Sequence, residues 1–291
     1  ADWGADVIKV EMPSTPSKNT QADPVKARHG PDFQNLHRNK RSLTLNLKEP
    51  DGLAIFKQLA DGVDVVIENY RPDVKHRLGI DYDTLRATNP RLVYASISGF
   101  GQDGPYEKRP GFDQIAQGMG GLMSITGLPG QGPVRVGIPI ADLSAGMYCA
   151  LGILVALLER EVSGEGQWVQ SSLLEAQISM LDFQAARWLV DHEVPLQAGN
   201  NHPTTIPTGV YPTADGHINI ATAGGDIYER LCRVLGDEDL ITDPDYATGQ
   251  ARSDNRDALN ERLNALTRKK PSAVWVKILN QAGVPCGPIY D

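Results

Sequence analysis

The stretches VDVVIE at residues 63–68 and LVYASIS at residues 92–98 decide the fold of this chain. Both are short, rich in β-branched residues and bounded by turn-forming residues, as buried strands are. A similar run, VIKVE, lies at residues 7–11. Between this run and residue 63, apolar residues recur at helical spacing: Leu53, Phe56, Leu59 and Ala60. The alternation of strands and helices predicts an α/β fold with a mostly parallel sheet covered by helices. The polar stretch 12–36 is predicted to cross the surface.

Two long apolar helices are predicted in the middle of the chain. The apolar run 143–158 is too short for a comfortable membrane span, and charged residues follow it directly, so it favours a buried core helix. A second helix is predicted over 173–190, because Ser172 and Glu175 form a capping box before an apolar stripe. We expect that stripe to pack in the core: Leu174, Ile178, Leu181 and Trp188.

The character of the sequence changes near residue 201. The strand-like runs 210–213 and 218–221 flank Asp215-Gly216, which is a strong hairpin signal. Three amphipathic helices follow, with apolar stripes at Ile227, Leu231 and Leu235, at Leu259, Leu263 and Leu266, and at Trp275, Ile278 and Leu279. We therefore predict a large domain over 1–200, a smaller α+β domain over 201–285, and the start of a return segment to the large domain over 286–291. The chain begins and stops within expected elements, so it is interpreted as truncated at both ends.

The composition of the chain argues against several classes of function. The net charge of −8 argues against a nucleic-acid partner, and no membrane span is expected. None of the six histidines has metal-ligand spacing to another histidine or to a cysteine, so no metal site is predicted. The three cysteines are far apart in the sequence, which favours a reducing compartment and a cytoplasmic location.

The sequence GFGQDG at residues 99–104 matches the spelling of a dinucleotide-binding loop after a predicted strand. In a true fingerprint the loop opens a helix whose N-terminus holds the pyrophosphate. Here residues 105–110, PYEKRP, continue as irregular chain. We interpret the stretch as a loop, which makes a nicotinamide or flavin oxidoreductase the weakest hypothesis.

Asp142 lies where an extended, proline-containing stretch turns into the apolar helix. One interpretation is a helix N-cap, since aspartate accepts backbone N–H bonds there. The other is a carboxylate nucleophile, because a rigid helix start would hold the group ionised and in a fixed orientation. The small neighbours Ala141, Ser144 and Ala145 fit either room for a ligand or close helix packing. The residue itself leaves both interpretations open.

Basic residues gather in two places in this acidic chain. Arg38, Lys40 and Arg41 form the first cluster, with Lys48 nearby, and the second runs from Arg71 to Arg77. Either cluster would suit the phosphates of a nucleotide-like ligand. Either would equally suit an ordinary solvated surface.

Seven short motifs, in order, give the chain its resemblance to a known family. They are GADVIKVE (4–11), NKRS leading to LNLK (39–48), ENYRP leading to RLG (68–79), GFD (111–113), DLSAG (142–146), SLLEA (172–176) and GVP (283–285). With these motifs the whole chain resembles the family III CoA transferases. That group includes formyl-CoA:oxalate and carnitine CoA transferases and the related α-methylacyl-CoA racemases.

The resemblance implies a fold, an activity and a site. The fold is a Rossmann-like large domain with a smaller domain, in a homodimer of interlocked subunits. Asp142 is the implied nucleophile, and coenzyme A is a substrate rather than a bound cofactor. The residues implied to hold CoA are Leu45, Asn46, Leu47, Lys48, Asn69, Tyr70, Arg71, Arg77 and Arg109. The substrate centre is expected to include Phe112, Asp113, Gly224 and Gly225, and the two glycines or the glycine-rich stretch 118–132 would supply backbone N–H groups to oxyanions.

Within this family, transfer of CoA between two carboxylic acids is the main hypothesis. A racemase is disfavoured, since the racemase branch has a histidine base where this chain has Phe112. A non-catalytic CoA-binding protein is the alternative from another class. The stretches 121–127 and 133–135 resemble the branch that uses succinyl-CoA and small dicarboxylates more than the oxalate branch.

Overall fold

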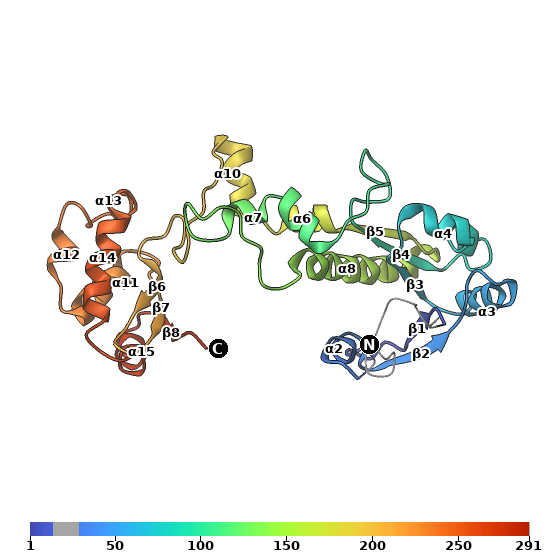
Figure 1. Ribbon diagram of the computed structural model, residues 1–291, viewed down its shortest axis with the longest axis horizontal. Coiled ribbons are helices and arrows are strands. Elements are labelled where there is room, and N and C mark those ends of the chain that lie inside the picture. The colour runs from blue at the N-terminus through green and yellow to red at the C-terminus, as the bar shows by residue number, and fades with distance from the viewer. Residues whose placement is uncertain (14–28, 291) are drawn as a thin grey trace. The chain divides into compact units, whose positions relative to one another are not determined.

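The structure is a computed structural model, which describes residues 1–13 and 29–290. The chain divides into two compact units. The large unit comprises Ala1–Gly120 and Gly137–Asp182, and the small unit comprises Gly121–Val136 and Phe183–Asp291. Each is described by itself below, with the element labels of Figure 1.

Parallel strands form the framework of the large unit. β1 (Val7–Glu11) pairs with β2 (Lys40–Thr44), and β3 (Val65–Glu68), β4 (Val93–Ser98) and β5 (Trp168–Ser172) form a separate sheet in that order. The predicted α/β class is therefore confirmed, and β1, β3 and β4 lie where the β-branched runs predicted them. β2 and β5 were not predicted, because KRSLT and WVQSS are polar and lack a continuous apolar run.

Short helices connect or follow these strands. They are α2 (Pro31–His37), α3 (Pro50–Ala60), α4 (Pro72–Leu78), α5 (Tyr82–Arg86), α6 (Asp113–Met119) and α9 (Leu173–Ser179). Proline opens α2, α3 and α4, where its missing N–H costs no hydrogen bond. One half of the predicted capping box is present, since the Ser172 Oγ accepts from the Glu175 N–H at 3.1 Å; the Glu175 Oε2 accepts from the Ser172 Oγ at 2.7 Å. In the polar stretch 12–36, α2 is helical and residues 14–28 lie outside the described residues.

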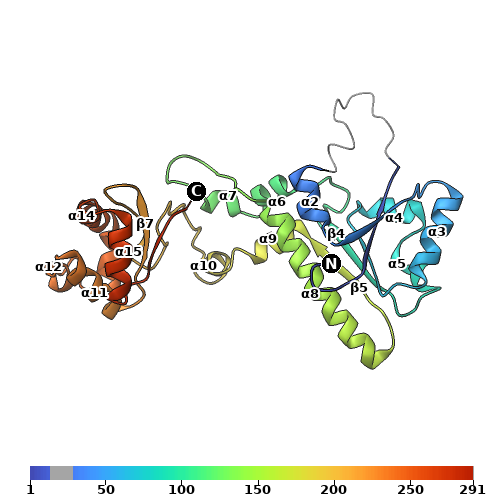
Figure 2. The ribbon, with the colours of Figure 1, turned by 90° about the horizontal axis from the view of Figure 1, so that it is seen from below.

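The long helix α8 (Ile140–Ser163) crosses back to β5 and lies beside the β3–β4–β5 sheet (Figures 1 and 2). Near its start, the Ala145 carbonyl accepts from the Ser171 Oγ at 3.1 Å, late in β5. Near its end, Arg160 donates to the Arg91 carbonyl at 3.1 Å, just before β4. α8 therefore runs antiparallel to the strands. Its first turn lies at their carboxyl ends.

The burial of α8 differs from the prediction of a buried core helix, because only one face of the helix is buried. Its buried side consists mainly of small residues, and a Cβ at Gly152 would lie 2.7 Å from a Val169 methyl group. Its large apolar residues are exposed: Met147, Leu151, Leu154, Val155, Leu158 and Val162. The prediction is wrong for these side chains, because small residues let the helix approach the sheet closely and leave the large ones on the outer face. Among the described residues, α8 is the one helix long and apolar enough to cross a membrane, a test that core helices of soluble proteins also pass.

The single helix predicted over 173–190 is two helices. α9 ends at Ser179, and α10 (Phe183–Asp191) begins after Asp182, whose φ of 49° breaks the helix. The predicted apolar stripe is also wrong, since Ile178 and Trp188 are exposed whereas Ala176 and Gln177 are buried. Because of this break, one apolar stripe does not continue through both helices.

A three-stranded antiparallel sheet and helices form the small unit. β6 (Thr208–Pro212) and β7 (His217–Ala221) make the predicted hairpin, and β8 (Cys286–Pro288) pairs with β7. The helices are α7 (Leu122–Ile125), α10, α11 (Gly225–Leu235), α12 (Asp239–Thr242), α13 (Gly249–Asp254), α14 (Arg256–Thr267) and α15 (Ser272–Gln281).

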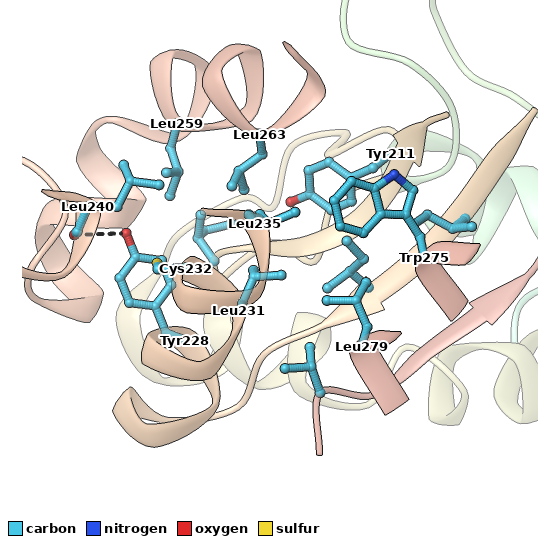
Figure 3. Close-up of a cluster of buried hydrophobic side chains, with 14 residues drawn as sticks. Tyr211, Tyr228, Leu231, Cys232, Leu235, Leu240, Leu259, Leu263, Trp275 and Leu279 are labelled. Carbon is cyan, nitrogen blue, oxygen red and sulfur yellow. Dashed lines mark hydrogen bonds between the residues drawn. The ribbon is translucent and has the colours of Figure 1, made fainter. Parts of the chain in front are cut away.

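The core of the small unit joins the three predicted stripes (Figure 3). Leu231 and Leu235 of α11 pack with Leu259 and Leu263 of α14. Trp275 of α15 is 2% exposed in the same cluster, and its Nε1 donates to the Thr267 carbonyl at 2.5 Å. The helical periodicity of the sequence therefore predicted this core.

The two units differ in extent from the predicted domains. Residues 121–136 group with the small unit, as do residues 183–200. Gln197 contributes to this grouping, because its side-chain N–H₂ donates to the carbonyls of Thr126 and Gly132 at 2.6 and 2.7 Å. The segment 286–291, predicted as the start of a return, begins with β8 in the small sheet. The domain boundaries of the protein stay a prediction.

Candidate active site

The carboxyl ends of β3, β4 and β5 form the edge of the large unit where several of the predicted residues gather. Residues 69–71 follow β3, the loop 99–112 follows β4, and α9 follows β5. The first turn of α8 reaches the same edge, as its antiparallel direction requires. Crevices outside the carboxyl ends of parallel strands are the usual ligand sites of α/β folds.

The loop after β4 contains the GFGQDG stretch and opens no helix. β4 ends at Ser98, and the next helix, α6, begins only at Asp113. Gly99 and Gly111 approach so closely that a Cβ on Gly99 would lie 2.7 Å from the Gly111 Cα. The interpretation as a loop is therefore confirmed. The close approach brings Phe112 and Asp113 back to the end of β4.

Asp142 is the third residue of α8, in its first turn, and the N-cap is Pro139. The N-cap interpretation is therefore wrong. The Asp142 side chain is exposed and accepts no hydrogen bond from the residues that the structure describes. Its neighbours Ala141, Ser144 and Ala145 are buried against α6, α9 and the sheet, so they fit the packing explanation. A rigid helix start thus presents an open carboxylate.

Asp113 supports the helix that carries Asp142. Its buried carboxylate accepts from the Ala141 backbone N–H at 2.9 Å and from the Gln117 side chain at 2.7 Å. The Gln117 Nε2 lies 3.3 Å from the Ile138 carbonyl, just before α8. Asp113 was predicted to contact substrate, and the structure gives its carboxylate these internal partners. The i, i+4 spacing of Asp113 and Gln117 in a helix was the available signal.

The environment shifts the pKa of Asp142 upward. Partial burial of the carboxyl group is the larger cause, although part of the side chain is exposed, and the negative charge of Asp113 is the second. Both make the ionised form less favourable and the carboxylate more basic.

Phe112 directly precedes Asp113 at the start of α6, but it is exposed whereas Asp113 is buried. Phe112 is the N-cap of α6, and the residue is 77% exposed. An exposed aromatic residue in the loop that returns to the end of β4 offers a surface for a substrate.

The segment 45–48 separates into core and surface positions. Leu45 and Leu47 are buried in a cluster with Ile80, the residue after the α4 C-cap. Asn46 closes a turn, since its Oδ1 accepts from the Lys48 N–H at 3.1 Å, and Lys48 is exposed. The two leucines therefore anchor the turn next to the end of α4. Ligand contacts would come from Asn46, from Lys48 or from the backbone.

The other predicted CoA residues lie on the surface of the large unit. Asn69, Tyr70 and Arg71 are exposed between β3 and α4. Arg77, late in α4, pairs with Asp73 at 3.3 Å. The Arg109 guanidinium stacks over the Tyr106 ring at 3.8 Å in the loop after β4.

The first basic cluster is mostly engaged in surface ion pairs. Arg38 pairs with Asp2 and Arg41 pairs with Asp6, each at 2.5 Å. The surface interpretation therefore applies to these two arginines. Lys48 is not part of these ion pairs.

Gly224 and Gly225 lie in the small unit, where they start α11. Both are exposed. The stretch 118–132 crosses from the end of α6 in the large unit to α7 in the small unit. Its glycines at 121, 127, 130 and 132 have positive φ angles, which suits turns.

Thiol and metal chemistry have little support in the described part of the chain. Burial raises the pKa of Cys232 and of Cys286 to about 11, and it also raises the pKa of Cys149. Protonated thiols are poor nucleophiles. No group of three potential metal ligands occurs among residues 1–13 and 29–290.

Comparisons with known proteins show the family of the chain. The family model described as CoA-transferase family III matches residues 1–291. The chain is 38% identical to the succinyl-CoA–D-citramalate CoA-transferase of Chloroflexus aurantiacus, over the whole chain and 73% of that protein. It is 39% identical to the succinate–glutarate CoA-transferase of Agrobacterium fabrum, over 99% of the chain and 74% of that protein. A crystal structure of a CAIB/BAIF family protein from Brucella suis superposes with a TM-score of 0.83 at 35% identity, over the whole chain and 78% of that structure.

Proposed function

The chain belongs to CoA-transferase family III and is a CoA transferase, and from this premise we propose that Asp142 carries CoA between two acids. The supporting observation is the Asp142 carboxylate itself. It is exposed, accepts no hydrogen bond within the described residues and is held by the first turn of α8. Asp113 fixes that turn through the Ala141 N–H.

The proposed reaction has four substitutions at carbonyl carbon. The Asp142 carboxylate attacks the donor thioester, which expels CoA thiolate and forms a mixed anhydride. The thiolate attacks the aspartyl carbonyl, releases the donor acid and leaves an aspartyl–CoA thioester. The acceptor carboxylate then displaces the thiolate, and the thiolate attacks the acceptor acyl carbon, which yields the new acyl-CoA and free Asp142. Backbone N–H groups are proposed to stabilise the oxyanions.

The nucleotide part of CoA is proposed to lie along the segments 45–48 and 69–71 with Arg77 and Arg109. The exposed cations among them suit phosphates, and the shared cluster of Leu45, Leu47 and Ile80 brings the segment 45–48 to the end of α4, the helix that carries Arg77. CoA enters as substrate, and no permanent cofactor is needed. A reducing compartment, the cytoplasm, fits the three free thiols.

We propose succinyl-CoA as donor and a small dicarboxylate as acceptor. The relatives from Chloroflexus and Agrobacterium are named for succinyl-CoA with citramalate and for succinate with glutarate. The resemblance of the stretches 121–127 and 133–135 supports the same branch. Phe112 offers no base for proton abstraction, which counts against a racemase.

The test of the function is a transfer assay with the full-length protein. A panel of acyl-CoA donors is incubated with succinate, glutarate, citramalate, oxalate and carnitine, and Asp142 is examined by mass spectrometry for a CoA adduct. We expect the adduct with succinyl-CoA and transfer to a dicarboxylate. Transfer to oxalate or carnitine alone would refute the substrate class, and a panel without any transfer would refute the function.

The pH dependence of transfer should reveal the raised pKa of Asp142. Only the ionised carboxylate attacks, so kcat/KM should fall as pH drops through the Asp142 pKa, beginning above the usual aspartate range. Asp113→Asn removes one cause of the shift and should move this acidic limb to lower pH. Asp257→Asn, an exposed change in α14, should leave the profile in place. An unchanged limb in Asp113→Asn would contradict the assignment of the limb to Asp142.

We also propose that the protein is a homodimer that covers the exposed stripe of α8. Leu151, Leu154, Leu158 and Val162 recur at helical spacing, and Val162 is 90% exposed. An apolar surface of this extent is usual at interfaces between subunits. The resemblance to interlocked family members supports a second copy as the partner.

Light scattering after size-exclusion chromatography should give twice the mass of one chain. The double change Leu154→Asp and Leu158→Asp should raise the dimer dissociation constant by roughly thirtyfold or more, since it places charges in an apolar contact. Ile55→Asp, on the exposed side of α3, is the matched control and should leave the dimer intact. A wild-type monomer at micromolar concentration would disprove the dimer, and an unaffected double variant would disprove this interface.

A further inference from the structure

A buried charged network lies behind the segment 69–71 of the large unit. The side chains of Lys75 and Glu68 are 1% and 5% exposed, and the Lys75 Nζ lies 3.1 Å from the Glu68 Oε1. The same ammonium group donates to the Gln102 Oε1, lies 3.4 Å from the Ser96 Oγ, and lies 5.2 Å from the Trp168 ring centroid. Lys75 belongs to the second basic cluster of the sequence. Its burial removes it from any phosphate-binding surface.

The partners of Lys75 connect two loops at the carboxyl ends of the strands. Glu68 ends β3, and its Oε2 accepts from the Tyr70 N–H at 2.8 Å, which fixes the start of the segment 69–71. Gln102 lies in the loop after β4 and donates to the Ser98 Oγ at 3.1 Å. Lys75 itself sits in α4, directly after the segment 69–71. One ammonium group therefore joins both ends of this segment to the neighbouring loop.

Stability alone is a weak explanation for such a pair. The desolvation of two charges offsets most of their attraction, so apolar side chains of similar size can serve a core equally well. An ion pair differs from apolar packing in its directional hydrogen bonds, which define the position of every partner. Here those partners are the loops on which exposed Asn69, Tyr70 and Arg71, and Arg109, are carried.

We propose that Lys75 is a positioning residue for CoA, which acts through Glu68 and Gln102 to hold the segment 69–71 and the loop 99–112 in their binding geometry. The inference rests on the proposed function, because that function assigns Asn69, Tyr70, Arg71 and Arg109 to CoA. Lys75 touches neither the ligand nor Asp142. Its removal should therefore weaken CoA binding without a matching effect on the acceptor acid.

The test compares the wild type with Lys75→Met. The dissociation constant of CoA, measured by titration calorimetry, and the KM for acyl-CoA should each rise roughly tenfold, as expected for losing directional charged hydrogen bonds. The KM for the acceptor acid should stay within about twofold of the wild-type value, because the variant weakens only the binding of CoA and acyl-CoA. A purely structural role would lower the melting temperature without this split.

Arg160→Met is the matched control for a lost buried cation. Arg160 is also buried in the large unit, where it pairs with Asp64 at 2.9 Å before β3. It lies at the amino ends of the strands, opposite the proposed site. This variant should lose thermal stability while its CoA dissociation constant stays at the wild-type value.

The double variant Lys75→Met with Glu68→Gln provides the test if Lys75→Met alone does not fold. It leaves no unpaired buried charge, so its melting temperature should return toward that of the wild type. Its CoA affinity should stay weakened, because the link to Gln102 is still missing. Wild-type CoA affinity in either folded variant, or an equal rise of both KM values, would overturn the inference. A wild type that binds no CoA and forms no aspartyl adduct would instead refute the proposed function.

Discussion

Replacing Asp142 with alanine is expected to lower CoA transfer by at least about a thousandfold, because removal of a covalent nucleophile costs that much or more. The aspartyl–CoA adduct should vanish from the mass spectrum at the same time. The fold should be little affected. The carboxylate accepts no hydrogen bond from the described residues, and its raised pKa means that its surroundings disfavour the charge.

Asp83 offers the matched control for Asp142→Ala. It is an exposed carboxylate in the first turn of α5, also in the large unit. Asp83→Ala should retain transfer and the adduct, which separates the loss of a nucleophile from the loss of a charge near a helix start. Transfer that survives Asp142→Ala, or an adduct on another residue, would disprove the mechanism.

The second large effect is expected in the core of the small unit. Trp275→Ala should reduce the free energy of unfolding of this unit by about 3–5 kcal/mol, since it leaves a cavity among Leu259, Leu263 and Leu279 and removes the bond to Thr267. Hydrogen exchange of peptides from α11, α14 and β7 measures this in the intact protein. Because α11 begins at Gly225, faster exchange there would also loosen Gly224 and Gly225.

Two substitutions calibrate the measurement on Trp275. Trp275→Phe keeps an aromatic ring in the cluster and should lose less stability than Trp275→Ala. Val274→Ala changes the adjacent, exposed residue of α15 and should stay within about 0.5 kcal/mol of the wild type. Unchanged exchange in Trp275→Ala would mean that this cluster is not the core of the unit.

The sequence predicted those features that depend on neighbours along the chain. β-branched runs located β1, β3 and β4, Asp215-Gly216 located the hairpin, and helical periodicity located the core around Leu231 and Trp275. Ordered motifs indicated the family, which the comparisons confirmed. The role of Asp142 as nucleophile stays a prediction, although the structure removes its interpretation as an N-cap.

Tertiary structure decided what depends on contacts between distant segments. Periodicity marks an apolar stripe on α8 but not which face meets the sheet, and small residues such as Ala145 turned out to form the buried face. Asp113 accepts from the Ala141 N–H where the approach of Gly111 to Gly99 brings the loop back to the end of β4.

Lys75 shows, in a single residue, the same difference between what the sequence predicts and what the tertiary structure decides. By sequence it is one cation of a basic cluster, typical of a solvated surface. In the fold it is buried against Glu68, Gln102 and Trp168, which come from three different parts of the chain. Local sequence determines propensity and pattern over a few residues, whereas burial and charge pairing depend on which distant groups the packed sheet brings together. Those contacts decided which residues of this chain are open to a ligand and which hold them in place.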